Sequence, residues 1–312
     1  MQKFELTILG CSSATPTSQR HPTSQLLNIA ERYCLIDCGE ATQIQLRRFK
    51  IKFQKINHIF ISHLHGDHYL GLMGLLASMH LLGRTKSLTL YCPPELQEII
   101  EVQNKHSFTK LKYEIKYHHL HHDKPEILFE DDKIQIEKIL MNHRINCFGF
   151  VFREKPLPRK LNKEKLEKYK VQPTKYKALQ KGMDIITEDG TTVPNSELTE
   201  VSAEPRSYAF CSDTCYDESI IEKIKNMDLL YHEATFMQNM ISRAKETYHS
   251  TTIQAGTIAK KANAGKLIIG HFSARYKDAG PLLDETKTVF ENTVLAVEGE
   301  RYEVEKFIQL ST

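Results

Sequence analysis

The segment His63–His68 reads His-Leu-His-Gly-Asp-His and places four metal-binding side chains within six positions. It directly follows the apolar, strand-like run Ile56–Ser62. Two imidazoles spaced by one residue at a strand end can reach one metal ion, and the Asp-His pair, after a turn that the glycine permits, can reach a second. These nitrogen and oxygen donors suit zinc best, with iron or manganese as lesser options. A His-rich surface loop is the alternative interpretation, but it explains neither the glycine nor the preceding strand.

Two metal ions need six or seven ligands, so other strand ends must supply the remainder. His143 follows a predicted strand at 133–140, Asp213 ends one at 206–212, and His271 ends one at 267–270. Strand ends of an α/β sheet commonly present site residues, although each of these three could singly be a cap or a core residue. We assign His63, His65 and His143 to one metal, Asp67, His68 and His271 to the other, and Asp213 to both.

The expected chemistry is hydrolysis of a phosphoester. Two metal ions about 3.5–4 Å apart activate a bridging water and stabilise the attacking and leaving oxygens. The bound water loses a proton near neutral pH, and Asp67 can hold the resulting hydroxide and act as the general base. A second pair, Glu233 and His249, can act at the phosphate if the carboxylate keeps the imidazole charged. The equally open alternative is that Glu233 caps a turn and His249 merely precedes a helix.

A basic segment at 153–193 interrupts the chain. Between Arg153 and Lys181 there are eleven Lys or Arg but three Asp or Glu, although the whole chain has a formal net charge of only +3. Sparse apolar residues and three prolines predict a projecting insertion that buries little surface. It is either a solvated, flexible insertion or an electrostatic arm for a polyanion. The candidate cations of such an arm are Arg159, Lys160, Lys175, Lys177 and Lys181.

The whole chain has 312 residues, enough for one large α/β domain or two smaller ones, and we expect a single domain over 1–312 that carries the basic segment as an insertion. Two blocks of short strands interleaved with helices predict two β-sheets with helices outside. Among the helices we expect 69–82, 217–226 and 251–264, the last with a capping box of Thr251 and Gln254. No apolar run reaches membrane-spanning length, and the first residues lack a signal peptide, so we expect a cytoplasmic protein that does not bind membranes. Seven scattered cysteines without a CxxC pair indicate reduced thiols.

Nearly the whole chain resembles the metallo-β-lactamase superfamily and, within it, the short-form ribonuclease Z family of tRNA 3′-processing endoribonucleases. The His-x-His-x-Asp-His segment marks the superfamily, and the other segments are more specific to the tRNA-processing branch. The matching stretches are Gly39–Gln43, Ser62–His68, Gly71-Leu72, His232–Phe236, His249–Thr252 and His271–Tyr276.

The resemblance implies a four-layer αβ/βα sandwich with an inserted flexible arm, two zinc ions per subunit (manganese is possible) and a homodimer. It also implies cleavage of precursor tRNA after the discriminator nucleotide, which leaves a 3′-hydroxyl on the tRNA, and binding of the tRNA elbow by the arm. The seven residues assigned above match the metal positions of the family. Asp67 matches its proton acceptor, and Glu233 with His249 matches the pair that assists at the phosphate.

Three departures from the family pattern stand out. A serine, Ser212, replaces the usual glycine before Asp213, and the arm has Pro173-Thr174-Lys175 instead of a Gly-Pro element. The loop at 16–22 matches the family pattern only loosely. In the family this loop is linked to the choice of cleavage site, and here Arg20 is the one plausible RNA contact that it retains.

Two other functions remain open from the sequence. A small-molecule phosphodiesterase or sulfatase of the same superfamily could use the same metal ligands, but it gains nothing from a strongly basic arm. A non-catalytic RNA-binding subunit could keep the fold, but such proteins usually lose metal ligands.

Overall fold

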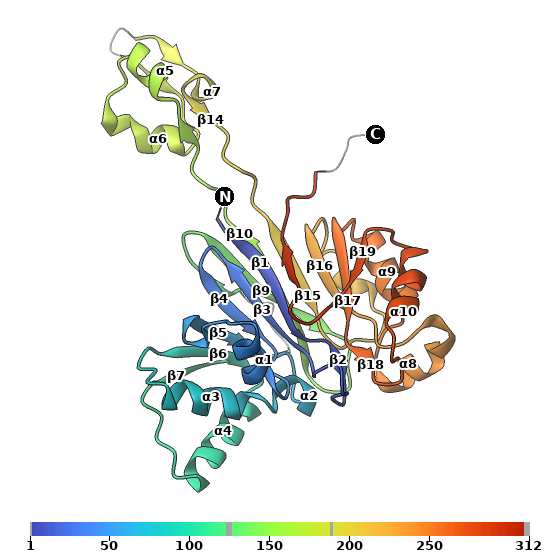
Figure 1. The fold of residues 1–312 in the computed structure, drawn as a ribbon. Helices are drawn as coiled ribbons and strands as arrows, with labels where there is room; N and C mark the ends of the chain where they lie inside the picture. Colours follow the sequence, from blue (N-terminus) through green and yellow to red (C-terminus); the bar gives the residue numbers. More distant parts are fainter. Residues whose placement is uncertain (1, 123–126, 188–189, 309–312) are drawn as a thin grey trace. The chain divides into compact units, whose positions relative to one another are not determined.

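The computed structural model describes residues 2–122, 127–187 and 190–308. The chain divides into two compact units. We call Gln2–Arg153 with Arg206–Thr312 the body, and Glu154–Pro205 the insertion (yellow-green in Figure 1). Within the described ranges, each helix is too short or too polar to cross a membrane.

Two seven-stranded mixed sheets form the body. The first has the order β20 (Arg301–Glu303), β1 (Phe4–Gly10), β3 (Ser24–Ile29), β4 (Arg32–Ile36), β5 (Ile56–Phe60), β6 (Leu88–Cys92) and β7 (Ile115–His119). The second has the order β19 (Thr293–Leu295), β17 (Lys266–Gly270), β16 (Leu229–Glu233), β15 (Ser207–Cys211), β10 (Cys147–Glu154), β9 (Ile134–Met141) and β8 (Ile127–Glu130). Strands β4 to β7 run parallel, as do β15, β16, β17 and β19.

Helices cover the outer face of each sheet (Figure 1). On the first sheet lie α1 (Thr42–Arg48), α3 (Leu72–Leu81) and α4 (Glu95–His106). On the second lie α9 (Thr252–Lys261) and α10 (Gly280–Lys287), with α8 (Ile241–Thr247) beside them. The predicted αβ/βα arrangement is therefore confirmed.

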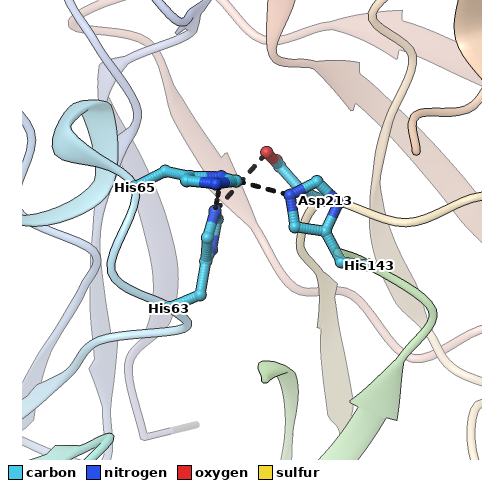
Figure 2. Close-up of side chains that lie close together, drawn as sticks. All are labelled: His63, His65, His143 and Asp213. Atoms are coloured by element: carbon cyan, nitrogen blue, oxygen red, sulfur yellow. Dashed lines mark hydrogen bonds and ion pairs between the residues drawn. The ribbon is translucent and has the colours of Figure 1, made fainter. Parts of the chain in front are cut away.

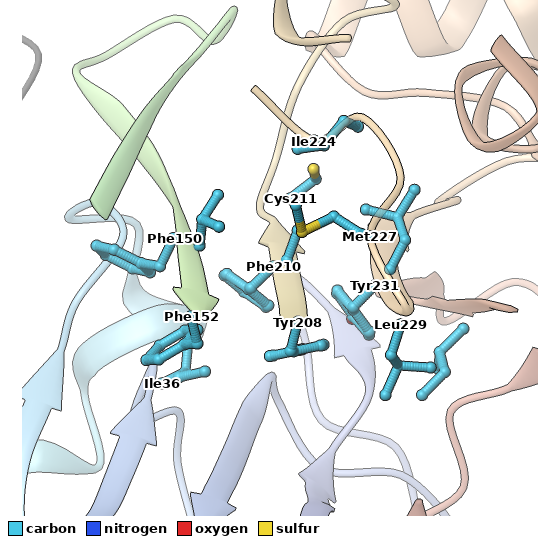
Figure 3. Close-up of a cluster of buried hydrophobic side chains, with 14 of the residues drawn as sticks. Ile36, Phe150, Phe152, Tyr208, Phe210, Cys211, Ile224, Met227, Leu229 and Tyr231 are labelled. Carbon is cyan, nitrogen blue, oxygen red and sulfur yellow. The ribbon is translucent and has the colours of Figure 1, made fainter. Parts of the chain in front are cut away.

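The core follows from strands that are apolar on both faces. In β4, Cys34 and Ile36 point to the cluster between the sheets, whereas Leu35 points to the helices of the first sheet, as the two-residue period of a strand requires. The inter-sheet cluster includes the aromatic side chains Phe150, Phe152, Tyr208, Phe210 and Tyr231 beside aliphatic ones, as Figure 3 shows. The rings of Phe60 in β5 and Phe150 in β10 lie 5.2 Å apart, centroid to centroid, so they join the two sheets directly. This packing fixes the strand ends that carry the site.

The predicted helices are only partly correct. The capping box of Thr251 and Gln254 is confirmed at the start of α9. The helix expected at 69–82 forms as α3 but begins later, at Leu72, because α2 (Gly66–Tyr69) ends before it. The break lies at Gly71, where a Cβ would come within 2.0 Å of the Gly39 carbonyl oxygen, so only glycine permits this approach. The helix expected at 217–226 is wrong: only Glu218–Ile220 form a 3₁₀ turn, the kind of short element common in connections.

The insertion has a hydrophobic core of its own, so the prediction that it buries little surface is wrong. Its described residues form the helices α5 (Lys163–Lys168), α6 (Tyr176–Gln180) and α7 (Asn195–Leu198), a 3₁₀ turn at Pro173–Lys175, and two strand pairs. The strand pairs are β11 (Lys160–Leu161) with β14 (Thr199–Glu200), and β12 (Ile185–Ile186) with β13 (Thr192–Val193). Its few apolar residues converge on one cluster of Leu166, Val171, Leu179, Ile185, Val193 and Leu198. The buried Asn195 donates from Nδ2 to the carbonyls of Leu179 and Met183, which ties α7 to the end of α6.

Replacing Leu179 should unfold the insertion while the body stays folded. Leu179→Ala removes the side chain of a fully buried residue, a change that costs about 2–5 kcal/mol and is large for a unit of this size. Limited proteolysis with mass spectrometry should locate new cleavage within 154–205. Met183→Ala, which truncates an exposed side chain of the same unit, is the matched control. Protease resistance equal to that of the wild type would show that this core does not hold the insertion together.

Candidate active site

All seven predicted metal ligands lie together in the body. His63 follows β5, and His65, Asp67 and His68 lie in the next loop and in α2. His143 lies in the turn between β9 and β10, Asp213 lies two residues after β15, and His271 directly follows β17. These strand ends meet because β15, β16 and β17 are parallel neighbours and because the aromatic core holds β5 against them. His271 has a φ of +60°, which turns the chain sharply at this edge.

The first group consists of His63, His65, His143 and Asp213, which point toward one another in Figure 2. His65 Nδ1 lies 3.0 Å from His63 Nε2 and 3.1 Å from His143 Nε2. Asp213 Oδ2 lies 3.7 Å from His63 Nε2. Zinc–nitrogen bonds of about 2.0–2.1 Å in a tetrahedral site place the ligand atoms roughly 3.3 Å apart. The spacing therefore fits one metal ion.

The second group consists of Asp67, His68 and His271, again with Asp213. His271 Nε2 lies 3.2 Å from Asp67 Oδ2 and 3.3 Å from Asp213 Oδ1, and His68 Nε2 lies 3.4 Å from Asp213 Oδ2. His68 Nε2 and Asp213 Oδ1 are buried without a hydrogen-bond partner. Buried polar atoms are normally satisfied, so these two atoms fit ligands of a second metal ion. Asp213 belongs to both groups, as a bridging carboxylate must.

Three imidazoles are oriented through the nitrogen that faces away from the ligand cluster. Asp37 Oδ2 accepts a hydrogen bond from His68 Nδ1 at 2.8 Å. The Tyr248 carbonyl accepts one from His143 Nδ1 at 2.9 Å. Thr235 Oγ1 lies 3.0 Å from His271 Nδ1. Each contact leaves Nε2 free to face the cluster, and such partners fix the tautomer of metal-binding histidines.

The sequence predictions did not include Asp37, Thr235 or Tyr248. Asp37 follows β4, which pairs in parallel with β5, so it lies at the same sheet edge as His63. This position at a strand end was the signal from which the sequence could have identified it. Its carboxylate also accepts from the amide and hydroxyl of Ser62, and Ser212 Oγ donates to Ser62 Oγ. The serine that replaces the family glycine before Asp213 thus joins this buried network.

Glu233 and His249 form a buried ion pair, as the sequence suggested. Glu233 Oε1 lies 3.0 Å from His249 Nδ1. The same carboxylate accepts from the amides of Thr214, Ser250 and Thr235, which fixes its position. Burial lowers the pKa of His249, but the charges of Glu233 and Asp213 outweigh burial and raise this pKa to about 9. The imidazole is therefore charged at neutral pH.

Two of the candidate ligands are held in the protonation states that bind cations, but His68 is not. Burial lowers the pKa of His68, but the charges of Asp213, Asp67 and Asp37 outweigh burial and raise it, so a metal ion would have to displace a proton there. Burial lowers the pKa of His63 well below its ordinary value, so this imidazole stays neutral. Burial raises the pKa of Asp67, but the neighbouring His68 and His271 outweigh it, and the net shift is downward. A neutral imidazole and an ionised carboxylate are the metal-binding forms.

The predicted RNA-binding cations lie in two places. Arg20 belongs to the body, where its guanidinium donates to the Tyr276 carbonyl and lies 5.8 Å from the centre of the Phe272 ring. Its Nε is buried without a partner. The other five lie on the insertion. Arg159 donates to Thr199 Oγ1 at 2.6 Å, whereas Lys160, Lys175, Lys177 and Lys181 are exposed.

Comparisons with known proteins agree with the geometry. The chain is 46% identical to ribonuclease Z of Phocaeicola vulgatus over 305 residues, which covers 98% of this chain and 99% of the relative. The solved structure of human tRNase Z, short form, matches with a TM-score of 0.71 and 26% identity over 96% of this chain and 99% of that one. The metallo-β-lactamase fold protein YhfI from Bacillus subtilis matches in fold, with a TM-score of 0.69 and 19% identity over 97% and 100%. A family model described as anti-Pycsar protein Apyc1 matches residues 4–158, just under half of the chain.

Asp37→Asn should weaken metal binding at the second group. The amide nitrogen cannot accept from His68 Nδ1, and the loss of such a partner costs roughly 10- to 100-fold in metal affinity. Metal content per chain after dialysis, measured by plasma mass spectrometry, should fall below that of the wild type. Asp217→Asn, which changes a carboxylate that caps a 3₁₀ turn, is the control. Two tightly held ions in the Asp37 variant would remove this carboxylate from the metal centre.

Proposed function

We propose, since this chain belongs to the ribonuclease Z family, that it removes the 3′ trailer of precursor tRNA by a single cut after the discriminator nucleotide. The chain has the metallo-β-lactamase fold and is a hydrolytic endoribonuclease of tRNA 3′ processing. The observation that carries the proposal is the convergence of seven metal ligands beside the buried pair of Glu233 and His249. A small-molecule phosphodiesterase or sulfatase could use the ligands, but the cations of the insertion favour a polyanionic substrate.

Two divalent metal ions would be held by His63, His65 and His143 on one side and by Asp67, His68 and His271 on the other, with Asp213 shared. The nitrogen-rich donor set favours zinc, with manganese as the second choice. When bound, the ions supply a water that is ionised at neutral pH and stabilise the charge that develops on the phosphate.

The protein's own residues position the nucleophile and protonate the leaving group. Asp67 Oδ2 is fixed by a hydrogen bond of 2.8 Å from the Ala14 amide, and this carboxylate would orient the attacking water and take its proton. His249, charged by its contact with Glu233, would donate a proton to the 3′ oxygen as the P–O bond breaks. This assignment leaves the 3′-hydroxyl on the tRNA and the phosphate on the trailer.

The substrate and the partner subunit would use other surfaces. The exposed lysines of the insertion would neutralise phosphates of the tRNA, as the family resemblance implies for this arm. The same resemblance implies a homodimer, and exposed apolar side chains such as Ile44, Leu81 and Leu82 on or beside α1 and α3 are suited to pack against a second copy. We place this reaction in the cytoplasm.

Cleavage of a 3′-extended precursor tRNA by the zinc-loaded protein tests the function. We expect one cut next to the discriminator nucleotide and much weaker hydrolysis of a small phosphodiester, bis-p-nitrophenyl phosphate. Asp67→Ala should abolish the cut while tRNA still binds in a gel-shift assay, and Asp284→Ala, an exposed carboxylate, should behave as wild type. Hydrolysis of the small ester alone would contradict the proposal and assign the protein to another branch of the superfamily.

His249→Ala should slow catalysis without weakening binding. The loss of a positioned general acid costs about 10²–10⁴-fold in kcat, whereas the affinity for precursor tRNA should change little. Glu233→Gln should have a similar effect, because a neutral amide no longer holds the imidazolium. Single-turnover kinetics separate the two quantities, and His106→Ala, an exposed histidine of α4, serves as the control. Wild-type rates in the His249 variant would remove it from the mechanism.

The affinity for tRNA should fall steeply with salt, and the insertion should account for part of this dependence. The triple variant Lys175→Gln, Lys177→Gln, Lys181→Gln should reduce the slope of log K against log[salt] by about one per lost phosphate contact. The matched control with the same charge change is Lys110→Gln, Lys112→Gln, Lys116→Gln on the body. Equal slopes for both triple variants would argue against an electrostatic arm.

A further inference from the structure

A cavity of about 410 Å³ opens in the body directly beside His249. It is lined by Asn142, Cys215, Tyr216, Ile241, Lys245, Tyr248, His249 and Gln254. Ligand pockets commonly measure roughly 300–1,000 Å³, so this cavity has room for one nucleoside. Apart from His249, its residues take no part in the mechanism above as proton donors or metal ligands.

Tyr248 is the unusual residue of this cavity. Its φ is +59°, a left-handed conformation that a bulky residue rarely adopts. Its carbonyl accepts from His143 Nδ1, so its backbone is tied to a metal ligand, while the residue remains 39% exposed. A strained backbone that holds an exposed aromatic residue at the edge of an active site points to function.

The remaining walls suit a nucleobase. Tyr216 adds a second aromatic ring, and its hydroxyl donates to Glu218 Oε1 at 2.6 Å, which holds this ring in place. Ile241 contributes apolar surface, while the amide of Asn142 and the ammonium of Lys245 can contact a base edge and a phosphate. Single-stranded RNA is typically bound in this way, by stacking on aromatic rings with a few polar contacts to base edges.

The position of His249 decides which nucleotide enters. In the proposed reaction the water oxygen forms a bond to phosphorus, the bond from phosphorus to the 3′ oxygen breaks, and this oxygen takes a proton from His249. The ribose that carries the leaving oxygen must therefore lie next to His249, and its base lies within reach of the adjoining cavity. Resting on the proposed function, we propose that this cavity is the subsite for the discriminator nucleotide, with Tyr248 as the ring on which its base stacks.

A double-mutant cycle between protein and RNA tests the subsite. The wild type, Tyr248→Ala and Tyr248→Phe are each assayed for kcat/KM on three precursor tRNAs: intact, abasic at the discriminator, and abasic at the first trailer nucleotide. Stacking of one base is worth roughly a 5- to 150-fold change by alanine substitution. Tyr248→Ala should lower kcat/KM by this factor on the intact and the trailer-abasic substrates. On the discriminator-abasic substrate it should lower kcat/KM only a little. Tyr248→Phe should behave as wild type on all three.

Phe108→Ala is the matched control, because Phe108 is also an exposed aromatic residue with a positive φ, of +51°, but does not line the cavity. Thermal melting and metal content of each variant show whether it remains folded and loaded. An equal loss by Tyr248→Ala on all three substrates would overturn the stacking role, and coupling to the trailer nucleotide would overturn the choice of occupant. If the wild type cut no precursor tRNA at all, the proposed function would fail, and the subsite with it.

Discussion

The buried carboxylate of Asp213 is the constraint around which this site is built. It lies within 4 Å of His63, His68, His249 and His271. Burial raises its pKa, but the imidazoles of His271, His68 and His249 outweigh burial and hold the pKa well below its ordinary value. An ionised group without water is costly unless cations compensate it. The surrounding histidines, and the divalent ions that they would hold, supply that compensation. The network from Asp37 through Ser62 to Ser212 then fixes the backbone that presents this carboxylate.

The candidate metal ligands were readable from the sequence, whereas the residues that orient them were not. The spacing within His63–His68 and the strand ends before His143, Asp213 and His271 identified the cluster, because ligand chemistry restricts residue types. Asp37, Thr235 and Tyr248 act through contacts between distant segments, and no local pattern reveals such contacts. Tyr248 is the extreme case, since its contribution to His143 is a backbone carbonyl that any residue could offer.

The two-sheet architecture was predictable for a different reason. Strands that are apolar on both faces, such as β4 and β5, require cover on each side, so the layers follow from the strand pattern. The same reasoning failed for the insertion. Its few apolar residues predicted little buried surface, but they form a core. Leu166, Leu179 and Leu198 lie far apart in sequence and become a core only when the short helices and strand pairs bring them together. Composition records how many apolar residues there are, not whether they meet.

The metal ligands come from both halves of the sandwich. His63, His65, Asp67 and His68 follow a strand of the first sheet, whereas His143, Asp213 and His271 follow strands of the second. Each ion would therefore act as a cross-link between two sheets that this edge otherwise joins by packing and by hydrogen bonds such as the one from Ser212 Oγ to Ser62 Oγ. Ligands that bind only the folded state stabilise it by mass action. Metal supply and the cohesion of the sandwich would thus be thermodynamically linked.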